Sequence, residues 1–156
     1  MTYFHRVIRS VEEKLGLNSL KQLAKVAGVQ TVFRIVSYYA DNRAHHSVAT
    51  LVCGRHEKPS LEVQYLGFLD NQTIHHTIEQ KALEQFMTII HQIRFDTLTY
   101  PIEQLSHSQT IWSLQRAVGR FTHEVMINPH RQDKPYCYLI NGIDGYLSDA
   151  VREITV

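Results

Sequence analysis

The sequence predicts a two-layer α+β domain, in which a five-stranded antiparallel sheet carries helices mainly on one face. Two observations predict this class. Apolar residues recur at helical spacing near both ends and in the middle of the chain, and the intervening segments are rich in β-branched and aromatic residues. The expected order is ααβββαββα. Because no linker or low-complexity segment divides residues 1–156, we expect a single domain.

The first half of the chain predicts two helices and then three strands. Apolar side chains repeat with a helical period over residues 4–15, and Gly16 follows as a C-terminal cap. A shorter helix begins after Asn18 or Ser19 and ends at Gly28. The predicted strands are residues 32–39, 47–54 and 61–69.

The second half begins with a long amphipathic helix. Thr77 and Gln80 form a capping-box pattern at its start, and its apolar stripe extends to Ile93. A polar connection leads to two further strands, and Pro135 opens the last helix.

The last two strands, residues 111–118 and 121–127, are separated only by Gly119 and Arg120, which predicts a type II′ hairpin. This turn fixes the register, so that Arg116 lies opposite His123 on an otherwise apolar face. The same register pairs Gln115 with Glu124 on the other face.

A buried arginine is costly unless it meets an anion. Arg116 and His123 are therefore the candidate ligand-binding residues, for a small anionic molecule. A structural carboxylate is the alternative and the one we expect, with Glu103, Asp144 or Asp149 as its source. Arg116 could also reach water near the turn.

The composition excludes several classes of protein. The 156 residues include 16 basic and 15 acidic ones, so the net charge of +1 gives no positive field of the kind that most nucleic-acid binders need. No apolar run approaches the roughly 20 residues of a membrane span, and residues 1–10 lack the pattern of a secretory signal. Cys53 and Cys137 are too few for a disulfide scaffold, which favours a reducing cytoplasm.

Four of the ten histidines form two adjacent pairs, His45-His46 and His75-His76. If the first three strands form a meander, both pairs emerge at the same end of the sheet. Imidazole is a common ligand of zinc, copper and haem iron, so these four residues are the candidate metal ligands. Histidines in solvated loops are the alternative, because no carboxylate or cysteine completes a known motif.

Residues 19–29 resemble the first helix and turn of bacterial helix-turn-helix repressors. The resemblance implies a DNA-binding regulator whose recognition helix would follow in residues 31–39. That segment has strand composition instead, so we expect an ordinary helix and no nucleic-acid partner.

Three further stretches, residues 32–38, 63–69 and 150–154, resemble small cyanobacterial proteins of a family without a settled activity. The resemblance implies at most a distant similarity to haem-degrading enzymes, and it carries no catalytic residue over to this chain. It leaves a haem- or metal-linked protein open as an alternative function.

The sequence shows no Gly-rich phosphate loop, nucleophile elbow or paired catalytic carboxylates, so it does not name a reaction. The leading expectation is a non-catalytic cytoplasmic binding or interaction protein. We also expect a homodimer, because an aromatic-rich strand over residues 33–39 would remain partly uncovered in a sheet with helices on one face.

Overall fold

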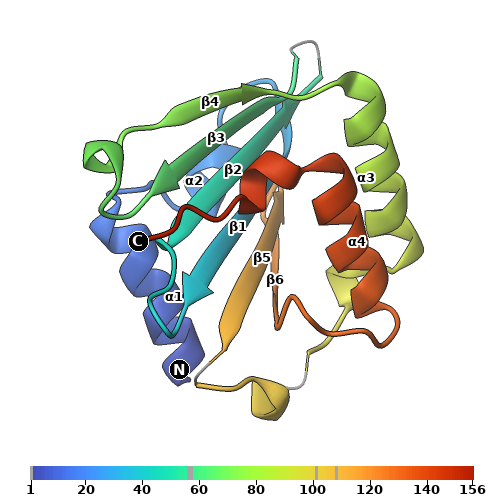
Figure 1. The fold of residues 1–156 in the computed structure, drawn as a ribbon. Coiled ribbons are helices and arrows are strands. Elements are labelled where there is room, and N and C mark those ends of the chain that lie inside the picture. Colours follow the sequence, from blue (N-terminus) through green and yellow to red (C-terminus); the bar gives the residue numbers. More distant parts are fainter. Residues whose placement is uncertain (1, 56–57, 101, 108) are drawn as a thin grey trace.

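The computed structural model describes residues 2–55, 58–100, 102–107 and 109–156, and contains a six-stranded sheet and four α-helices (Figure 1). The helices are α1 (Tyr3–Lys14), α2 (Leu20–Ala24), α3 (Gln80–Gln92) and α4 (Tyr136–Tyr146). The strands are β1 (Val29–Tyr39), β2 (Ser47–Gly54), β3 (Ser60–Tyr65), β4 (Ile74–Thr77), β5 (Thr110–Val118) and β6 (Phe121–Ile127). Short 3-10 helices are η1 (Leu69–Asn71), η2 (Phe95–Thr97), η3 (Ile102–Gln104) and η4 (Ser148–Val151).

The sheet is antiparallel throughout, as predicted, and its spatial order is β4-β3-β2-β1-β5-β6. The longest strand, β1, has 11 residues and lies between β2 and β5. The hairpin of β5 and β6 has the expected register, with Val118 opposite Phe121. Gly119 adopts the positive φ (+57°) that a type II′ turn needs at its first central position.

Helices cover both faces of the sheet, so the prediction of a mainly one-sided, two-layer arrangement is wrong. On one face, α1 packs its apolar stripe against Val36 of β1 and Ile111 of β5. On the other face, α3 and α4 enclose the larger core, which includes Phe33 and Ile35 of β1. Since β1 is covered on both sides, its residues are buried without interruption from Thr31 to Ser37 rather than alternately.

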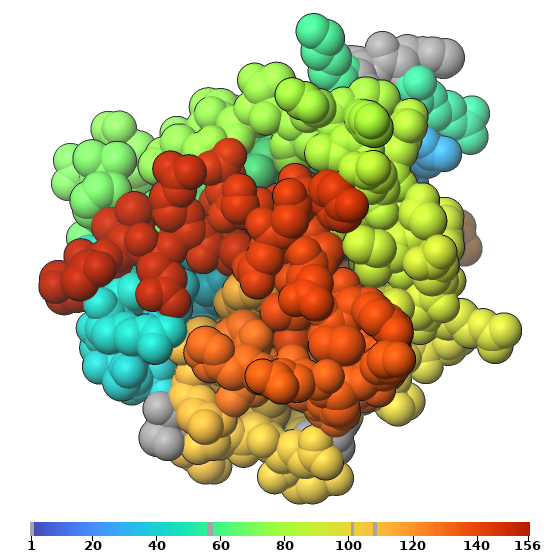
Figure 2. Space-filling model, turned by 45° about the vertical axis from the view of Figure 1, so that its right-hand side comes forward, coloured from blue at the N-terminus to red at the C-terminus, as the bar shows by residue number. Residues whose placement is uncertain are grey.

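Figure 2 shows the face formed by α3 and α4, where α4 (orange) lies directly beside α3 (yellow-green). Gly142 makes this close approach possible. A Cβ atom at this position would lie 2.7 Å from Cδ1 of Ile89 on α3. The glycine lowers the helix propensity of α4, but it lets the two helices cover the sheet together.

The sheet has six strands rather than five, because residues 74–77 form β4 along the outer edge of β3. β4 has only four residues and no buried side chain, so nothing in its sequence distinguishes it from a loop. The strand predicted over residues 61–69 ends at Tyr65, and η1 lies in the turn that leads from there into β4. The capping box of Thr77 and Gln80 does not form: Glu79 is the N-cap of α3, without a side-chain hydrogen bond.

Residues 19–39 do not form a helix-turn-helix. α2 begins at Ser19 with a capping box to Gln22, but residues 29–39 are β1 in the middle of the sheet. The segment that would be the recognition helix is a strand buried between two helical layers. The helix that would enter the major groove is therefore missing at this position.

The aromatic side chains that motivated the expected homodimer are also buried inside the chain. Phe33 and Tyr39 of β1 are buried, and Tyr38 is half-buried. The homodimer therefore loses much of the aromatic surface that motivated it and stays a prediction. No helix in the described part of the chain is long and apolar enough to cross a membrane.

Candidate anion-binding site

Arg116 lies near the end of β5, on the sheet face covered by α3 and α4. As the sequence predicts, it is opposite His123 of β6, and on its other side it is opposite Phe33 of β1. The guanidinium carbon of Arg116 lies 5.6 Å from the centroid of the Phe33 ring. The residue is only 9% exposed, so its charge is held inside the protein.

The counter-ion of Arg116 is Asp96, whose Oδ2 accepts a hydrogen bond from Nη1. We expected Glu103, Asp144 or Asp149, and the structure uses none of them here. Asp96 belongs to η2, directly after α3, and its neighbour Phe95 is buried against Phe33 in the core. The sequence places residue 96 only in a polar connection, whose path across the sheet depends on tertiary packing.

The ion pair leaves two buried polar atoms without a partner. Among the described residues, Nε of Arg116 and Oδ1 of Asp96 have no hydrogen bond. A buried donor or acceptor without a partner costs about 1–3 kcal/mol. A guanidinium can bind a carboxylate through two parallel hydrogen bonds, and this pair makes only one.

A cavity of about 520 Å³ opens beside Arg116, at the end of the sheet where β1 begins and where β2 and β5 end. Thr31, Cys53 and Arg116 line it from the sheet. One face of α3 forms the opposite wall with Gln80, Leu83, Glu84, Met87, Thr88 and His91. Among the described residues, the lining therefore combines the buried cation of Arg116 and the carboxylate of Glu84 with apolar and neutral polar side chains, and the volume is in the range of small-molecule sites.

The thiol of Cys53 is buried in the wall of this cavity. Burial raises the pKa of Cys53 to about 11, although the nearby positive charge of Arg116 acts in the opposite direction. A nucleophilic cysteine requires a lowered pKa. Cys53 is thus a protonated thiol in the wall of the cavity rather than an activated nucleophile.

His123 does not line this cavity in the described part of the chain, although it is the neighbour of Arg116. Its Nε2 donates a hydrogen bond of 2.7 Å to the carbonyl of Leu98, and its ring lies edge-on to Phe95. His123 therefore holds the segment that carries Asp96. Of the two predicted ligand-binding residues, the structure places Arg116 at the cavity and gives His123 a supporting position.

His45 and His46 contact different parts of the fold. Nδ1 of His45 donates to the carbonyl of Leu66, whereas Nδ1 of His46 accepts the backbone N–H of Tyr39. Burial, and then the positive charge of Lys14, lowers the pKa of His46. A neutral ring is what this acceptor role requires.

His75 and His76 do not join this pair. His76 of β4 lies opposite Leu61 of β3, whereas the carbonyl of His46 accepts the N–H of Leu66. Five residues of strand separate these points, or roughly 16 Å at about 3.3 Å per residue. β4 runs back along β3 and carries its histidines away from the predicted end of the sheet.

The side chains of the second pair face separate carboxylates. His75 lies 3.5 Å from Glu62 and His76 lies 3.4 Å from Asp149. Within the described ranges, no group of three or more His, Cys, Asp or Glu side chains could hold a metal ion. The geometry thus gives the predicted metal site of His45, His46, His75 and His76 no support.

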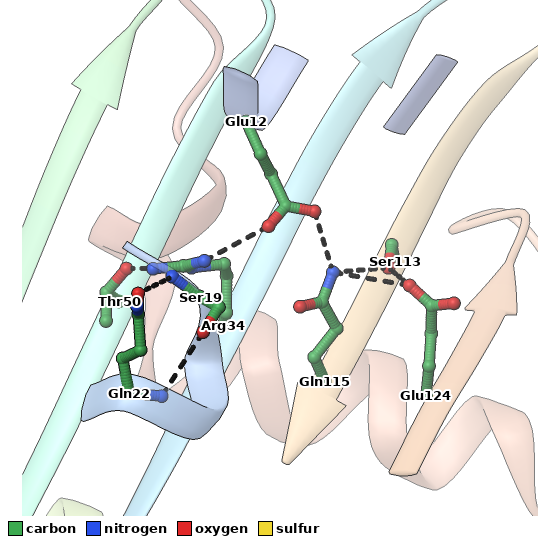
Figure 3. Close-up of polar contacts among 8 residues, drawn as sticks. All are labelled: Glu12, Ser19, Gln22, Arg34, Thr50, Ser113, Gln115 and Glu124. Carbon is green, nitrogen blue, oxygen red and sulfur yellow. Dashed lines mark hydrogen bonds and ion pairs between the residues drawn. The ribbon is translucent and has the colours of Figure 1, made fainter. Parts of the chain in front are cut away.

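A second buried arginine, Arg34, was not singled out from the sequence. It lies on β1 and faces α1, on the opposite side of the sheet from Arg116. Nη1 of Arg34 binds Oε2 of Glu12 at 3.0 Å, and Nε donates to Thr50 at 3.2 Å (Figure 3). Burial lowers the pKa of Arg34, and the charge of Glu12 opposes this effect.

The contacts of Glu12 extend across the sheet. Its Oε1 accepts a hydrogen bond from Gln115, which also donates to Glu124, as Figure 3 shows. Ser113 donates to the same oxygen of Glu124 at 2.7 Å. The predicted pairing of Gln115 with Glu124 was the signal that could have indicated this network.

Neither a known protein-family model nor a curated protein matches this chain, so its site must be interpreted from its own geometry.

Proposed function

We propose that the chain is a non-catalytic binding protein for a small anionic molecule, which it holds in the cavity beside Arg116. One observation carries the proposal: a guanidinium that is about nine-tenths buried lines a cavity of about 520 Å³, and its one hydrogen bond among the described residues is to Asp96. A bound anion would give that cation a further charge-assisted hydrogen bond, which is stronger than one between neutral groups.

The other walls define the class of ligand. Leu83 and Met87 offer apolar surface, whereas the carboxylate of Glu84 stands in the same lining. A second negative charge on the ligand would be repelled by Glu84 and Asp96, and the described part of the lining offers no second arginine or lysine to bind it. A monoanion with an apolar body, such as a carboxylic acid, therefore fits the lining best.

Binding rather than catalysis is supported by the thiol in the cavity. Its pKa of about 11 keeps Cys53 protonated near neutral pH, which disfavours nucleophilic attack.

The test uses hexanoate as the probe and hexan-1-ol as its neutral counterpart, measured by titration calorimetry at low ionic strength. We expect Arg116→Met to weaken hexanoate binding by at least ~10-fold, since a hydrogen bond to a charged group contributes about 1.5–3 kcal/mol. Arg120→Met is the matched control, because Arg120 is an exposed residue of the same hairpin. Equal binding of hexanoate to both variants, or of hexan-1-ol and hexanoate to the wild type, contradicts the proposal.

A further inference from the structure

The ion pair of Arg116 and Asp96 raises a question about any anion that enters the cavity. Arg116 carries one positive charge, and Asp96 already neutralises it. A ligand carboxylate beside this pair would place two negative charges on one largely buried guanidinium. Such pairs of carboxylates repel strongly. Either the ligand binds weakly or Asp96 leaves.

The side chain of Asp96 can turn into solvent more easily than that of Arg116. The side chain of Asp96 is 40% exposed, whereas that of Arg116 is 11% exposed. Rotation toward solvent would hydrate the carboxylate. Its one hydrogen bond to Arg116 leaves Oδ1 without a partner among the described residues. The ion pair is therefore incomplete even before a ligand binds.

The backbone around Asp96 is anchored independently of this ion pair. Phe95 is buried in the core, the carbonyl of Leu98 accepts from His123, and the carbonyl of Thr99 accepts from the hydroxyl of Tyr136. These three contacts hold the segment on both sides of residue 96. Release of the carboxylate therefore needs a change of side-chain rotamer and no unfolding of η2.

We propose that Asp96 is a built-in competitor for the anion site: the anionic group of the ligand replaces the Asp96 carboxylate on Arg116, and Asp96 turns to solvent. This inference rests on the proposed function. It makes Asp96 a regulator of affinity, which keeps Arg116 neutralised while the cavity is empty and weakens ligand binding by the free energy of the displaced ion pair.

The decisive variant is Asp96→Asn, which keeps the size of the side chain and removes its charge. In calorimetric titrations with hexanoate at low ionic strength, we expect Asp96→Asn to bind about 10-fold more tightly than the wild type, equivalent to about 1.4 kcal/mol. Asp70→Asn is the control, since Asp70 is an exposed residue of η1 and its loss changes the net charge equally. We expect Asp70→Asn to bind as the wild type does.

Two outcomes separate this inference from the proposed function. If Asp96→Asn binds hexanoate equally or more weakly while Arg116→Met still abolishes binding, the site stands and the competitor role of Asp96 is refuted. Loss of the difference between Arg116→Met and the wild type refutes the proposed function itself. Asp96→Ala provides the same comparison if the asparagine variant folds poorly, which its circular dichroism spectrum will show.

Discussion

Two arginines are buried on neighbouring strands of this sheet, and they face opposite layers of the molecule. Arg34 of β1 is 1% exposed beneath α1, and Arg116 of β5 is 9% exposed beneath α3 and α4. Arg34 has hydrogen bonds at both Nε and Nη1, to Thr50 and Glu12. Arg116 has one to Asp96 and none at Nε among the described residues.

The different hydrogen-bond partners of the two arginines indicate different roles. The guanidinium of Arg34 is bound by side chains that are themselves hydrogen-bonded, since Gln115 connects Glu12 to Glu124. Such a closed set of partners indicates a structural role. The incomplete set at Arg116 lies next to a cavity, and an incomplete set beside open space indicates a position for a ligand.

The largest expected effect is the removal of the counter-ion of Arg34. Glu12→Ala leaves a buried cation without a charged partner, which typically costs 3–5 kcal/mol. We expect a loss of about 3 kcal/mol in the free energy of unfolding, because Glu12 is 18% exposed and water can replace part of its contact. Urea denaturation measures this loss, and Glu13→Ala, at the exposed neighbouring position, is the control.

A loss of less than about 1 kcal/mol in the free energy of unfolding of Glu12→Ala would contradict the structural role of the Arg34–Glu12 ion pair. It would mean that Arg34 reaches water or another acceptor, and that its partner set is not closed.

The same substitution on the other side of the sheet should cost less. Asp96→Ala removes the counter-ion of Arg116, but the guanidinium lines a cavity that water can enter. We expect about 1–2 kcal/mol of destabilisation at low salt, also by urea denaturation. Added hexanoate should stabilise Asp96→Ala more than Glu12→Ala, because Glu12→Ala keeps Asp96 on Arg116 and a ligand stabilises a folded state more when it binds that state more tightly. Equal stabilisation of the two variants would show that Asp96 does not compete with the anion for Arg116.

The position of Arg116 could be predicted from the sequence, whereas its partner could not. Gly119 fixes a local turn, and the turn fixes the register that sets Arg116 opposite His123. The position of Asp96 depends on the path of the chain after α3, where Arg94 has a positive φ (+53°) that the sequence does not indicate. Local chemistry is present in the sequence, and long-range placement emerges only from packing.

The same distinction explains why the two histidine pairs lie apart in the structure. A meander of three strands is a local inference, and β1, β2 and β3 do pair in that order. β4 then adds a short edge strand with no buried residue, and its pairing with β3 moves His75 and His76 along the sheet. Only the tertiary structure contains that information.

Thr50→Val would leave Arg34, like Arg116, with an Nε that has no hydrogen-bond partner. It removes the acceptor of Arg34 Nε and keeps a β-branched side chain of similar size in the middle of β2. We expect a destabilisation of about 1 kcal/mol, the usual net contribution of one hydrogen bond. Hexanoate should bind this variant as it binds the wild type. A new hexanoate site that depends on Arg34 would show that an unpartnered guanidinium nitrogen suffices without a cavity.

The smallest expected effect concerns the burial of the Cys53 thiol in the wall of the cavity beside Arg116. Burial raises the pKa of Cys53 from 9.0 to about 11, so the folded state keeps the proton of the thiol while the unfolded state loses it. The stability that this difference gives is therefore complete below pH 9 and decreases as the pH rises toward 11. Between pH 8 and pH 9.5, the wild type should lose about 1 kcal/mol more than Cys53→Ala does, measured by urea denaturation at each pH. Cys137→Ala is the control, because Cys137 lies in α4 outside the cavity. If the stability of the wild type and of Cys53→Ala responds equally to alkali, the thiol is hydrated in the folded state. Water would then also weaken the attraction between Arg116 and a ligand carboxylate in the cavity.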